Sequence, residues 1–193
     1  MFVEKVELIA DAHNHDGFPE PLKGEIAFVG RSNVGKSSLL NVIFGRQIAK
    51  TSSTPGKTRS LLFFKVNDFY HFIDFPGYGY AKVSKIERQK WQSLVDDYFK
   101  SERPLKGIFL LVDSMIPTQR SDLEAFDFFK SFVDVFIVLT KVDRIKKNQI
   151  SKKVKTVEED FMGVKGVIPF SSITKDGLKE IEGILREIFE NER

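Results

Sequence analysis

Hydrophobic positions along the chain fall into strand-length runs separated by segments of helical periodicity. The runs lie at 25–29, 61–66, 69–73, 107–112, 135–139 and 166–170. Three of them are apolar almost throughout, at 26–29, 108–112 and 135–139, which is typical of strands buried on both faces of a parallel sheet. The alternation predicts an α/β three-layer sandwich with a mainly parallel, six-stranded sheet.

Helical spacing, with apolar residues near i, i+3, i+4 and i+7, fills the segments between several of these runs. Four such stripes begin at Trp91, Ala125, Ile150 and Leu178. Before the second stripe, Ser121 and Glu124 have the spacing of a capping box, in which both side chains bond backbone N–H groups at a helix start. We therefore expect a helix capped by Ser121.

One link between strands is too short for a helix. Only Asn67 and Asp68 separate the runs at 61–66 and 69–73, which is the length of a β-hairpin turn, so one strand is expected to be antiparallel. No linker or repeat divides the chain. We expect one domain over residues 1–193, with an N-terminal strand and loop at 1–23 and the core at 24–193.

Composition narrows the class of protein. The 193 residues are 41% hydrophobic and 30% charged, enough to bury a core. The absence of cysteine excludes disulfide scaffolds and thiolate chemistry. No apolar run is long enough for a membrane span, and the N-terminus lacks a secretory pattern, so we expect a cytoplasmic protein. The net charge of +3 permits a polyanionic partner without requiring one.

Residues 30–37, GRSNVGKS, match the phosphate-binding pattern G-x-x-x-x-G-K-S/T. A predicted strand precedes the motif and a helix can follow it, as this loop requires. The glycines let successive backbone N–H groups point at a phosphate, Lys36 can bridge the β- and γ-phosphates, and Ser37 can bind magnesium. The residues predicted to hold the phosphates are Gly30, Arg31, Ser32, Asn33, Val34, Gly35, Lys36 and Ser37.

A carboxylate follows the predicted strand at 69–73. Asp74, Phe75, Pro76 and Gly77 form the sequence D-x-P-G. By itself this sequence is also good turn chemistry. After a phosphate loop and at a strand end, we interpret Asp74 as reaching a magnesium-bound water and the Gly77 N–H as facing a γ-phosphate.

A third polar segment follows the run at 135–139. Thr140, Lys141, Val142 and Asp143 match only a weak four-residue pattern, which taken singly fits an ordinary polar loop. In third place after the other two motifs, it favours guanine recognition. Asp143 can accept hydrogen bonds from guanine N1–H and the 2-amino group, whereas adenine would leave the carboxylate unpaired. The stem of Lys141 can lie against the base, and Ser171 and Ser172 can bring backbone N–H groups to the guanine oxygen.

These motifs together resemble the translation-factor-related GTPases and, more closely, the bacterial EngB (YsxC) family among the TrmE-Era-EngA-EngB-like GTPases. The likeness rests on residues 30–37, TPGKT at 54–58, DFPGYGYA at 74–81 and FSS at 170–172. It covers most of the chain, from about Ile26 onward. The resemblance implies a Ras-like fold, binding of GTP or GDP with Mg²⁺, assembly of the large ribosomal subunit, and a need in cell division and septation.

Positions carried over from the resemblance complete the expected site. Magnesium would be bound by Ser37 and Thr58, with Asp74 beside it. The first switch would comprise Gly56, Lys57, Thr58, Arg59 and Ser60, the second Asp74, Phe75, Pro76 and Gly77, while Phe170, Ser171 and Ser172 would flank the base. Thr140 departs from the asparagine usual in the wider superfamily, so a somewhat weaker guanine site is expected.

Hydrolysis is expected to be slow. Ras-type enzymes orient the attacking water with a glutamine after the D-x-x-G glycine, and here that residue is Tyr78. Catalysis would rest on Lys36, Thr58 and Gly77. Asn33 can hold a potassium ion beside the phosphates or only cap the loop. Arg59 can serve as an arginine finger or be a solvated residue.

Two other functions remain open. An ATP-using P-loop kinase would lack an aspartate aligned for guanine, and a non-catalytic guanine-nucleotide scaffold on ribosomal RNA would explain Tyr78 as lost chemistry. A basic patch favours a contact with the large subunit or its RNA, although a solvated helix face has the same composition. The patch comprises Lys146, Lys147, Lys152, Lys153 and Lys155. We expect a monomer without a membrane span.

Overall fold

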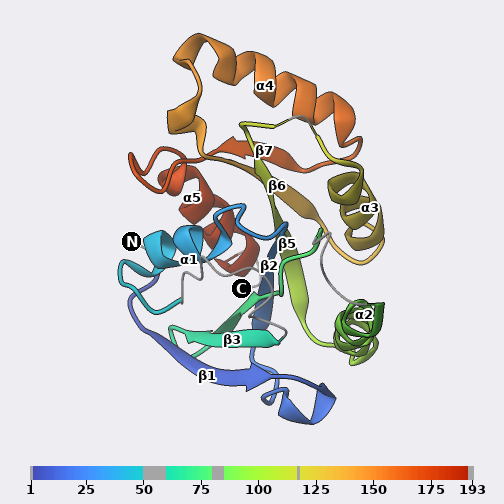
Figure 1. Cartoon of the computed structure of the whole chain (residues 1–193). Coiled ribbons are helices and arrows are strands. Elements are labelled where there is room, and N and C mark those ends of the chain that lie inside the picture. Colours follow the sequence, from blue (N-terminus) through green and yellow to red (C-terminus); the bar gives the residue numbers. More distant parts are fainter. Residues whose placement is uncertain (1, 50–59, 80–84, 117, 191–193) are drawn as a thin grey trace.

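The computed structural model describes residues 2–49, 60–79, 85–116 and 118–190. Over these residues the chain forms one seven-stranded sheet between helices (Figure 1). The strands are β1 (Val6–Ala12), β2 (Gly24–Gly30), β3 (Leu61–Val66), β4 (Tyr70–Asp74), β5 (Leu105–Asp113), β6 (Val135–Thr140) and β7 (Gly166–Pro169). The helices are α1 (Lys36–Phe44), α2 (Lys85–Lys100), α3 (Arg120–Phe129), α4 (Lys147–Asp160) and α5 (Leu178–Glu190), with 3₁₀ turns η1 (His15–Gly17) and η2 (Val142–Arg144).

The sheet has the order β1-β3-β4-β2-β5-β6-β7. Strands β4, β2, β5, β6 and β7 run parallel, and β3 is antiparallel to both of its neighbours. The single antiparallel strand predicted from the short link is confirmed. The link is one residue longer than expected, because Val66 pairs with Tyr70. Asn67 and Asp68 have φ angles of 50° and 63°, the left-handed conformation of both central residues of a type I′ turn, and the Phe69 N–H closes the turn on the Val66 carbonyl.

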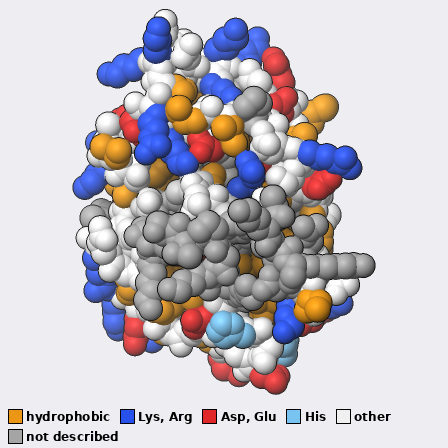
Figure 2. Space-filling view, viewed as in Figure 1, with side chains coloured by type: hydrophobic (Ala, Val, Ile, Leu, Met, Phe, Trp, Pro, Cys, Tyr) orange, Lys and Arg blue, Asp and Glu red, His pale blue; other side chains and the backbone are white. Residues whose placement is uncertain are grey.

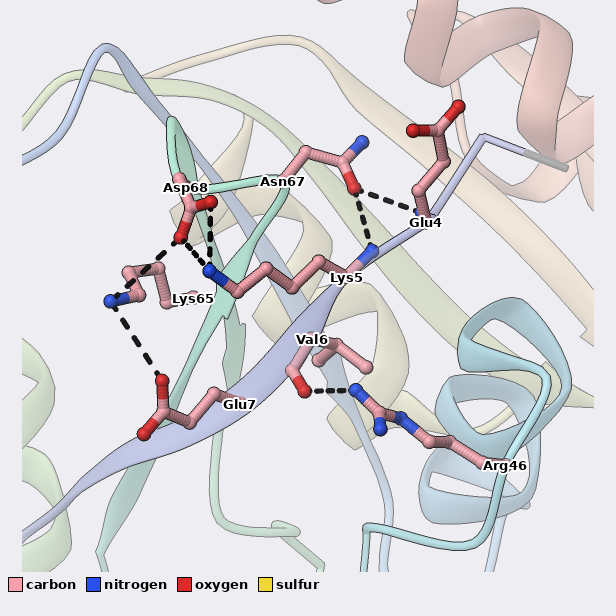
Figure 3. Close-up of polar contacts among 8 residues, drawn as sticks. All are labelled: Glu4, Lys5, Val6, Glu7, Arg46, Lys65, Asn67 and Asp68. Atoms are coloured by element: carbon pink, nitrogen blue, oxygen red, sulfur yellow. Dashed lines mark hydrogen bonds and ion pairs between the residues drawn. The ribbon is translucent and has the colours of Figure 1, made fainter.

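The predicted number of six strands is wrong, because the N-terminal strand joins the sheet edge as a seventh member. β1 pairs with β3 along its length. Its entry is held by the hairpin turn: Asn67 Oδ1 accepts the Glu4 and Lys5 N–H groups, and the Lys5 ammonium lies 2.8 Å from Asp68 (Figure 3). An edge strand is half exposed, so β1 carries charged residues and lacks the continuous apolar run that marks the inner strands.

Alternate residues of the sheet face two separate layers of helices, so the three-layer sandwich is confirmed. Ile26 and Phe28 on β2 pack in the core cluster that contains α1 and α5. Ala27 and Val29 on the same strand pack in the other cluster, with α2, α3 and α4. Burial on both faces explains why the central strands are apolar almost throughout.

The predicted capping box is wrong. α3 begins at Arg120 with Gln119 as its N-cap residue, so Ser121 lies inside the first turn. Glu124 instead accepts a hydrogen bond of 2.7 Å from Arg120 Nε, an i,i+4 pair on the helix surface. A Ser-x-x-Glu pattern arises inside a helix as easily as at its start, and the sequence alone does not separate the two.

Parallel strands bring distant motifs to one edge of the sheet. The carboxyl ends of β2, β4, β5 and β6 are Gly30, Asp74, Asp113 and Thr140, and register pairs adjacent strands across this edge, with Gly30 opposite Leu111 and Asp113 opposite Thr140. Ligands of open parallel sheets bind beyond these carboxyl ends. All three predicted motifs therefore begin at the same edge.

Candidate nucleotide-binding site

The loop at 30–37 connects β2 to α1, as predicted. Two of its residues adopt positive φ: Asn33 at 60° and Gly35 at 110°. A side chain at Gly30 would place its Cβ 2.9 Å from Val34 Cγ1, so this position accepts only glycine while Val34 stays buried. Because α1 begins at Lys36, the free N–H groups of its first turn lie at the loop, where an anion is favoured.

Lys36 and Asp74 meet across the tips of β2 and β4. Lys36 Nζ lies 2.5 Å from Asp74 Oδ1, with 12% and 5% of the two side chains exposed. At this distance the Lys36 ammonium is the charged partner of Asp74 Oδ1, and no other described group donates to that oxygen. Burial raises the pKa of Asp74, and the Lys36 ammonium only partly offsets it.

The surroundings of Asp74 fit a hydrated magnesium ion. Among the described residues, Lys36 is the one charged group that offsets the burial of the Asp74 carboxylate, and it does so only in part. Hydroxyl and carboxylate oxygens are the donors that Mg²⁺ prefers, and Ser37 follows Lys36 in the first turn of α1. The residues present therefore suit the metal that the sequence predicts, with Thr58 outside the described residues.

The D-x-P-G segment continues β4 along the phosphate loop. The Tyr78 N–H donates to the Gly30 carbonyl at 3.3 Å, and the Ser32 N–H donates to the Tyr78 carbonyl at 3.2 Å. A Cβ at Gly77 would lie 2.9 Å from the backbone of Ser32. The close approach of these two backbones therefore requires glycine at 77.

The Phe75 side chain lies outside the site, although the sequence analysis grouped it with the nucleotide-binding residues. It is buried in the layer of α2 and α3, where its ring and that of Tyr98 pack edge to face with their centroids 5.2 Å apart. Pro76 is also buried, and its carbonyl accepts a hydrogen bond of 3.2 Å from Trp91 Nε1. These side chains hold the segment in place and leave its backbone at the sheet edge.

The segment after β6 contacts the phosphate loop directly. The buried Thr140 hydroxyl lies 2.7 Å from the Val34 carbonyl and 3.2 Å from the Val112 carbonyl, so its hydrogen is directed at the backbone beneath the loop. Lys141 Nζ lies 3.0 Å from the Asn33 carbonyl and 2.6 Å from Asp113 Oδ2. Thr140 thus positions the phosphate loop, and Lys141 spans both motifs.

Asp143 is exposed and is oriented by a buried serine. The Ser171 hydroxyl donates to Asp143 Oδ1 at 2.6 Å and accepts the N–H groups of Ile173 and Thr174. The other oxygen of Asp143 accepts no hydrogen bond within the described part of the chain. The Ser171 N–H donates to the Asp176 carbonyl, so of the two serine N–H groups expected to meet the base, only that of Ser172 remains.

Two further side chains differ from their expected positions. Phe170 is 1% exposed and belongs to the core under α1 and α5, so it flanks no base. Val142 is buried as well, and its N–H donates to the Phe170 carbonyl. Both residues join the loops after β6 and β7 and act through the backbone.

Four of the five residues predicted for the first switch lie outside the described residues: Gly56, Lys57, Thr58 and Arg59. Ser60 is described and is 2% exposed. The roles assigned to these residues of the first switch remain predictions.

Sequence reasoning missed two aspartates. Asp113 pairs with Lys141, and its place at the carboxyl end of a buried strand was a usable signal. Asp122 accepts a hydrogen bond of 2.9 Å from the Tyr78 hydroxyl. That contact joins the second switch to α3, and nothing in the spacing of the two residues indicates it.

Comparisons with known proteins agree with this geometry. Residues 25–141 match the family model of the 50S ribosome-binding GTPase. Probable GTP-binding proteins EngB from Thermotoga petrophila and Thermotoga maritima are 50% and 52% identical over 184 residues, covering 94% of this chain and 94% of each relative. The chain belongs to the EngB family of GTP-binding proteins. The matched range contains the phosphate loop, the D-x-P-G segment and the first two residues of the third motif, whereas Asp143 and the loop after β7 lie beyond it.

Solved structures support the fold. A crystal structure of a probable GTP-binding protein EngB matches with a TM-score of 0.71 at 23% identity, covering 86% of this chain and 99% of the other. Era in complex with MgGDPNP and 16S ribosomal RNA matches with a TM-score of 0.68 at 23% identity, over 88% of this chain and 57% of Era. The Ras-like GTPase fold is therefore confirmed. No helix among the described residues is long and apolar enough to cross a membrane.

Proposed function

We propose that this EngB-family chain binds GTP and GDP with magnesium and hydrolyses GTP slowly, as a cytoplasmic switch in assembly of the large ribosomal subunit. A need for it in normal cell division and septation would follow from that role. The observation that supports the proposal most is the contact of Lys141 with the Asn33 carbonyl at 3.0 Å. It joins the guanine motif to the phosphate loop, so one nucleotide can span both.

Each motif has a distinct task in this proposal. The N–H groups at the start of α1 and the Lys36 ammonium would bind the phosphates, which releases Lys36 from Asp74. Ser37 and Thr58 would hold magnesium, with Asp74 accepting a hydrogen bond from a metal-bound water. Bound magnesium supplies positive charge that offsets charge developing on the phosphates. Asp143, held by Ser171, would accept the two guanine N–H groups.

Slow turnover is supported by the direction of Tyr78. Its hydroxyl bonds Asp122 on α3, and no other group of its side chain can orient water. Catalysis would then depend on Lys36, Thr58, the Gly77 N–H and magnesium, with a ribosomal partner completing the site. Potassium bound near Asn33 would add positive charge. Equal single-turnover rates in potassium and sodium at matched ionic strength would refute the potassium site.

The guanine assignment is tested by Asp143→Asn. Xanthine has a carbonyl where guanine has its 2-amino group, so an asparagine amide should prefer xanthosine nucleotides. Titration with labelled GDP, XDP and ADP measures the change, and Glu159→Gln on the exposed face of α4 serves as the control. A variant that still favoured GDP would contradict the role of Asp143.

The partner surface is proposed at the start of α4, the helix that follows the guanine motif. Figure 2 shows Lys and Arg side chains gathered over this helix. Within the described residues, Lys146, Lys147, Lys152 and Lys155 make no ion pair, whereas Lys153 donates to the Ile116 carbonyl at 2.9 Å. No acidic residue lies in the first turn, so Lys146 and Lys147 add to the positive helix end, and Lys152 and Lys155 extend the basic surface along the helix.

Contact of these lysines with ribosomal RNA should be strongly salt-dependent. The experiment is sedimentation with large ribosomal subunits in GDP and in a non-hydrolysable GTP analogue, at increasing salt. Lys152→Gln with Lys155→Gln should weaken binding, and Lys165→Gln, whose ammonium lies 3.3 Å from Asp134, is the control. If binding occurs equally in both nucleotide states and turnover is never stimulated, the scaffold function is favoured instead.

A further inference from the structure

Tyr78 is held at both ends, in contrast to the water-orienting glutamine that Ras-type enzymes carry at this position. On one side its backbone exchanges two hydrogen bonds with Gly30 and Ser32 of the phosphate loop. On the other side its ring packs on the core under α2 and α3, and its hydroxyl donates to Asp122 Oδ1 at 2.9 Å. The residue therefore ties the phosphate loop to α3.

Asp122 is an unusual acceptor, because it is a carboxylate only 2% exposed on an otherwise amphipathic helix. The charged groups that act on it are the Arg31 guanidinium, which attracts it, and Asp113, which repels it. Arg31 Nε is itself buried without a hydrogen-bond partner among the described residues. A Cβ at Gly79 would lie 3.0 Å from that nitrogen. A second residue of the phosphate loop thus reaches the same segment.

Gly77 lies between two anchored neighbours. The Pro76 carbonyl is bonded to Trp91 on α2, and Tyr78 is bonded to Asp122 on α3. With residues 76 and 78 held, rotation of the peptide that carries the Gly77 N–H is restricted. This N–H is the group that the proposed function assigns to the γ-phosphate.

We propose that Asp122 is a positioning residue which, through the Tyr78 hydroxyl, holds Gly77 ready for a γ-phosphate and thereby raises the affinity for GTP relative to that for GDP. The inference rests on the proposed function, since it presumes that Gly77 faces the third phosphate. GDP has no γ-phosphate, so its affinity should not depend on this contact.

A matched control exists at the opposite, amino end of the parallel strands. The Tyr98 hydroxyl donates to Glu25 Oε2 at 2.7 Å, so it is a second tyrosine whose hydroxyl is bonded to a buried carboxylate. Tyr98→Phe and Tyr78→Phe therefore each remove a hydroxyl that donates a hydrogen bond to a carboxylate. Only Tyr78 touches the phosphate loop, which separates a positioning role from a merely structural one.

The experiment titrates the full chain with labelled GDP and with a non-hydrolysable GTP analogue, and records thermal unfolding. Tyr78→Phe should weaken binding of the analogue about fivefold and change GDP affinity less than about twofold. Tyr98→Phe should lower the unfolding temperature and leave the ratio of the two affinities at the wild-type value. An unchanged ratio in Tyr78→Phe would overturn the proposal.

Two variants of Asp122 identify the interaction responsible. Asp122→Asn keeps an oxygen that accepts the Tyr78 hydroxyl, so it should retain the wild-type ratio, whereas Asp122→Ala should reproduce Tyr78→Phe. If the affinity for the GTP analogue relative to GDP fell as much in Asp122→Asn as in Asp122→Ala, the hydrogen bond would not be the cause. The negative charge opposite Arg31 would then be responsible. If the wild-type protein bound neither nucleotide, the proposed function would fail, an outcome distinct from an unchanged ratio.

Discussion

Two buried carboxylates lie at opposite ends of the neighbouring strands β2 and β4, and their surroundings differ. Glu25, near the start of β2, is fully buried and hydrogen-bonded by His71, Tyr98 and Arg103. Asp74, at the end of β4, has a single described partner, the Lys36 ammonium 2.5 Å from its Oδ1. Glu25 therefore has all its partners within the chain, whereas Asp74 has room for a further positive partner such as a hydrated metal ion.

The pKa values follow this difference. Burial alone would raise the pKa of Glu25, but hydrogen bonds from His71, Arg103 and Tyr98 outweigh it and hold the pKa below its ordinary value. At Asp74 burial prevails over Lys36, and the pKa is raised. A buried carboxylate whose pKa is lowered by its partners stabilises the folded state, as Glu25 does. A buried carboxylate whose pKa is raised costs stability, and such groups are often found at functional sites, as at Asp74.

The largest effect is expected from Glu25→Ala. It leaves the Arg103 guanidinium, with 5% of its side chain exposed, without its charged partner. Breaking a buried pair in this way should lower the free energy of unfolding by about 3–5 kcal/mol. Urea unfolding measures the loss. The affinity of the folded fraction for nucleotide should be unchanged. A selective loss of GTP binding would contradict the assignment of Glu25 to stability and of Asp74 to nucleotide binding.

Asp74→Asn should have the opposite pattern of effects, with a small change in stability and a large loss of nucleotide affinity. The neutral amide removes the cost of burying the Asp74 charge but leaves the Lys36 ammonium without its partner, and because these effects oppose each other stability without nucleotide should change by only about 1 kcal/mol. Magnesium-dependent affinity for GTP should fall about 10- to 100-fold, as when a group that orients metal ligands is lost. Titrations with magnesium and with a chelator measure the effect. Equal affinities of variant and wild type in magnesium would exclude Asp74 from the metal site.

The two carboxylates should also give opposite pH dependences. The lowered pKa of Glu25 contributes stability above its unfolded value near 4.5, which is lost as the pH falls through the folded pKa. The raised pKa of Asp74 costs stability at neutral pH, and this cost disappears as the pH falls through its folded pKa toward 3.8. Relative to Glu25→Gln, the wild type should therefore lose stability on acidification, and relative to Asp74→Asn it should gain. Slopes of the same sign in urea unfolding from about pH 7 to about pH 3 would contradict both assignments.

The same contrast explains what the sequence could predict. Apolar runs and the two-residue link at Asn67 and Asp68 predicted the inner strands and the one antiparallel strand, because burial and turn geometry are local signals. β1 was not counted in the sheet, because a half-exposed edge strand resembles a loop with a few apolar residues. Ser121 and Glu124 matched a cap only by spacing.

At the site, the backbone motifs were predictable and the side-chain directions were not. Lys36, Asp74 and Asp143 all lie at the predicted edge. Phe170, however, turns into the core, and Tyr78 turns to α3. Such directions depend on packing between segments far apart in the chain, and no pattern within one motif encodes them. For the same reason Asp113 and Asp122 were identified only from the fold.

The smallest effect is expected from Asp113→Asn, which tests one of those hidden partners. Asp113 Oδ2 lies 2.6 Å from Lys141 Nζ, with 17% and 27% of the two side chains exposed, so the pair is partly screened by solvent. Loss of the Asp113 charge should remove the ion pair that holds Lys141 in place and lower the affinity for nucleotide about threefold. Because Lys141 lies at the base side of the site, GDP and the GTP analogue should be affected equally. Asp134→Asn, which removes an exposed ion pair with Lys165 at the other end of β6, should leave both affinities unchanged. A loss confined to the GTP analogue would instead assign Asp113 to the γ-phosphate side, with Tyr78 and Asp122.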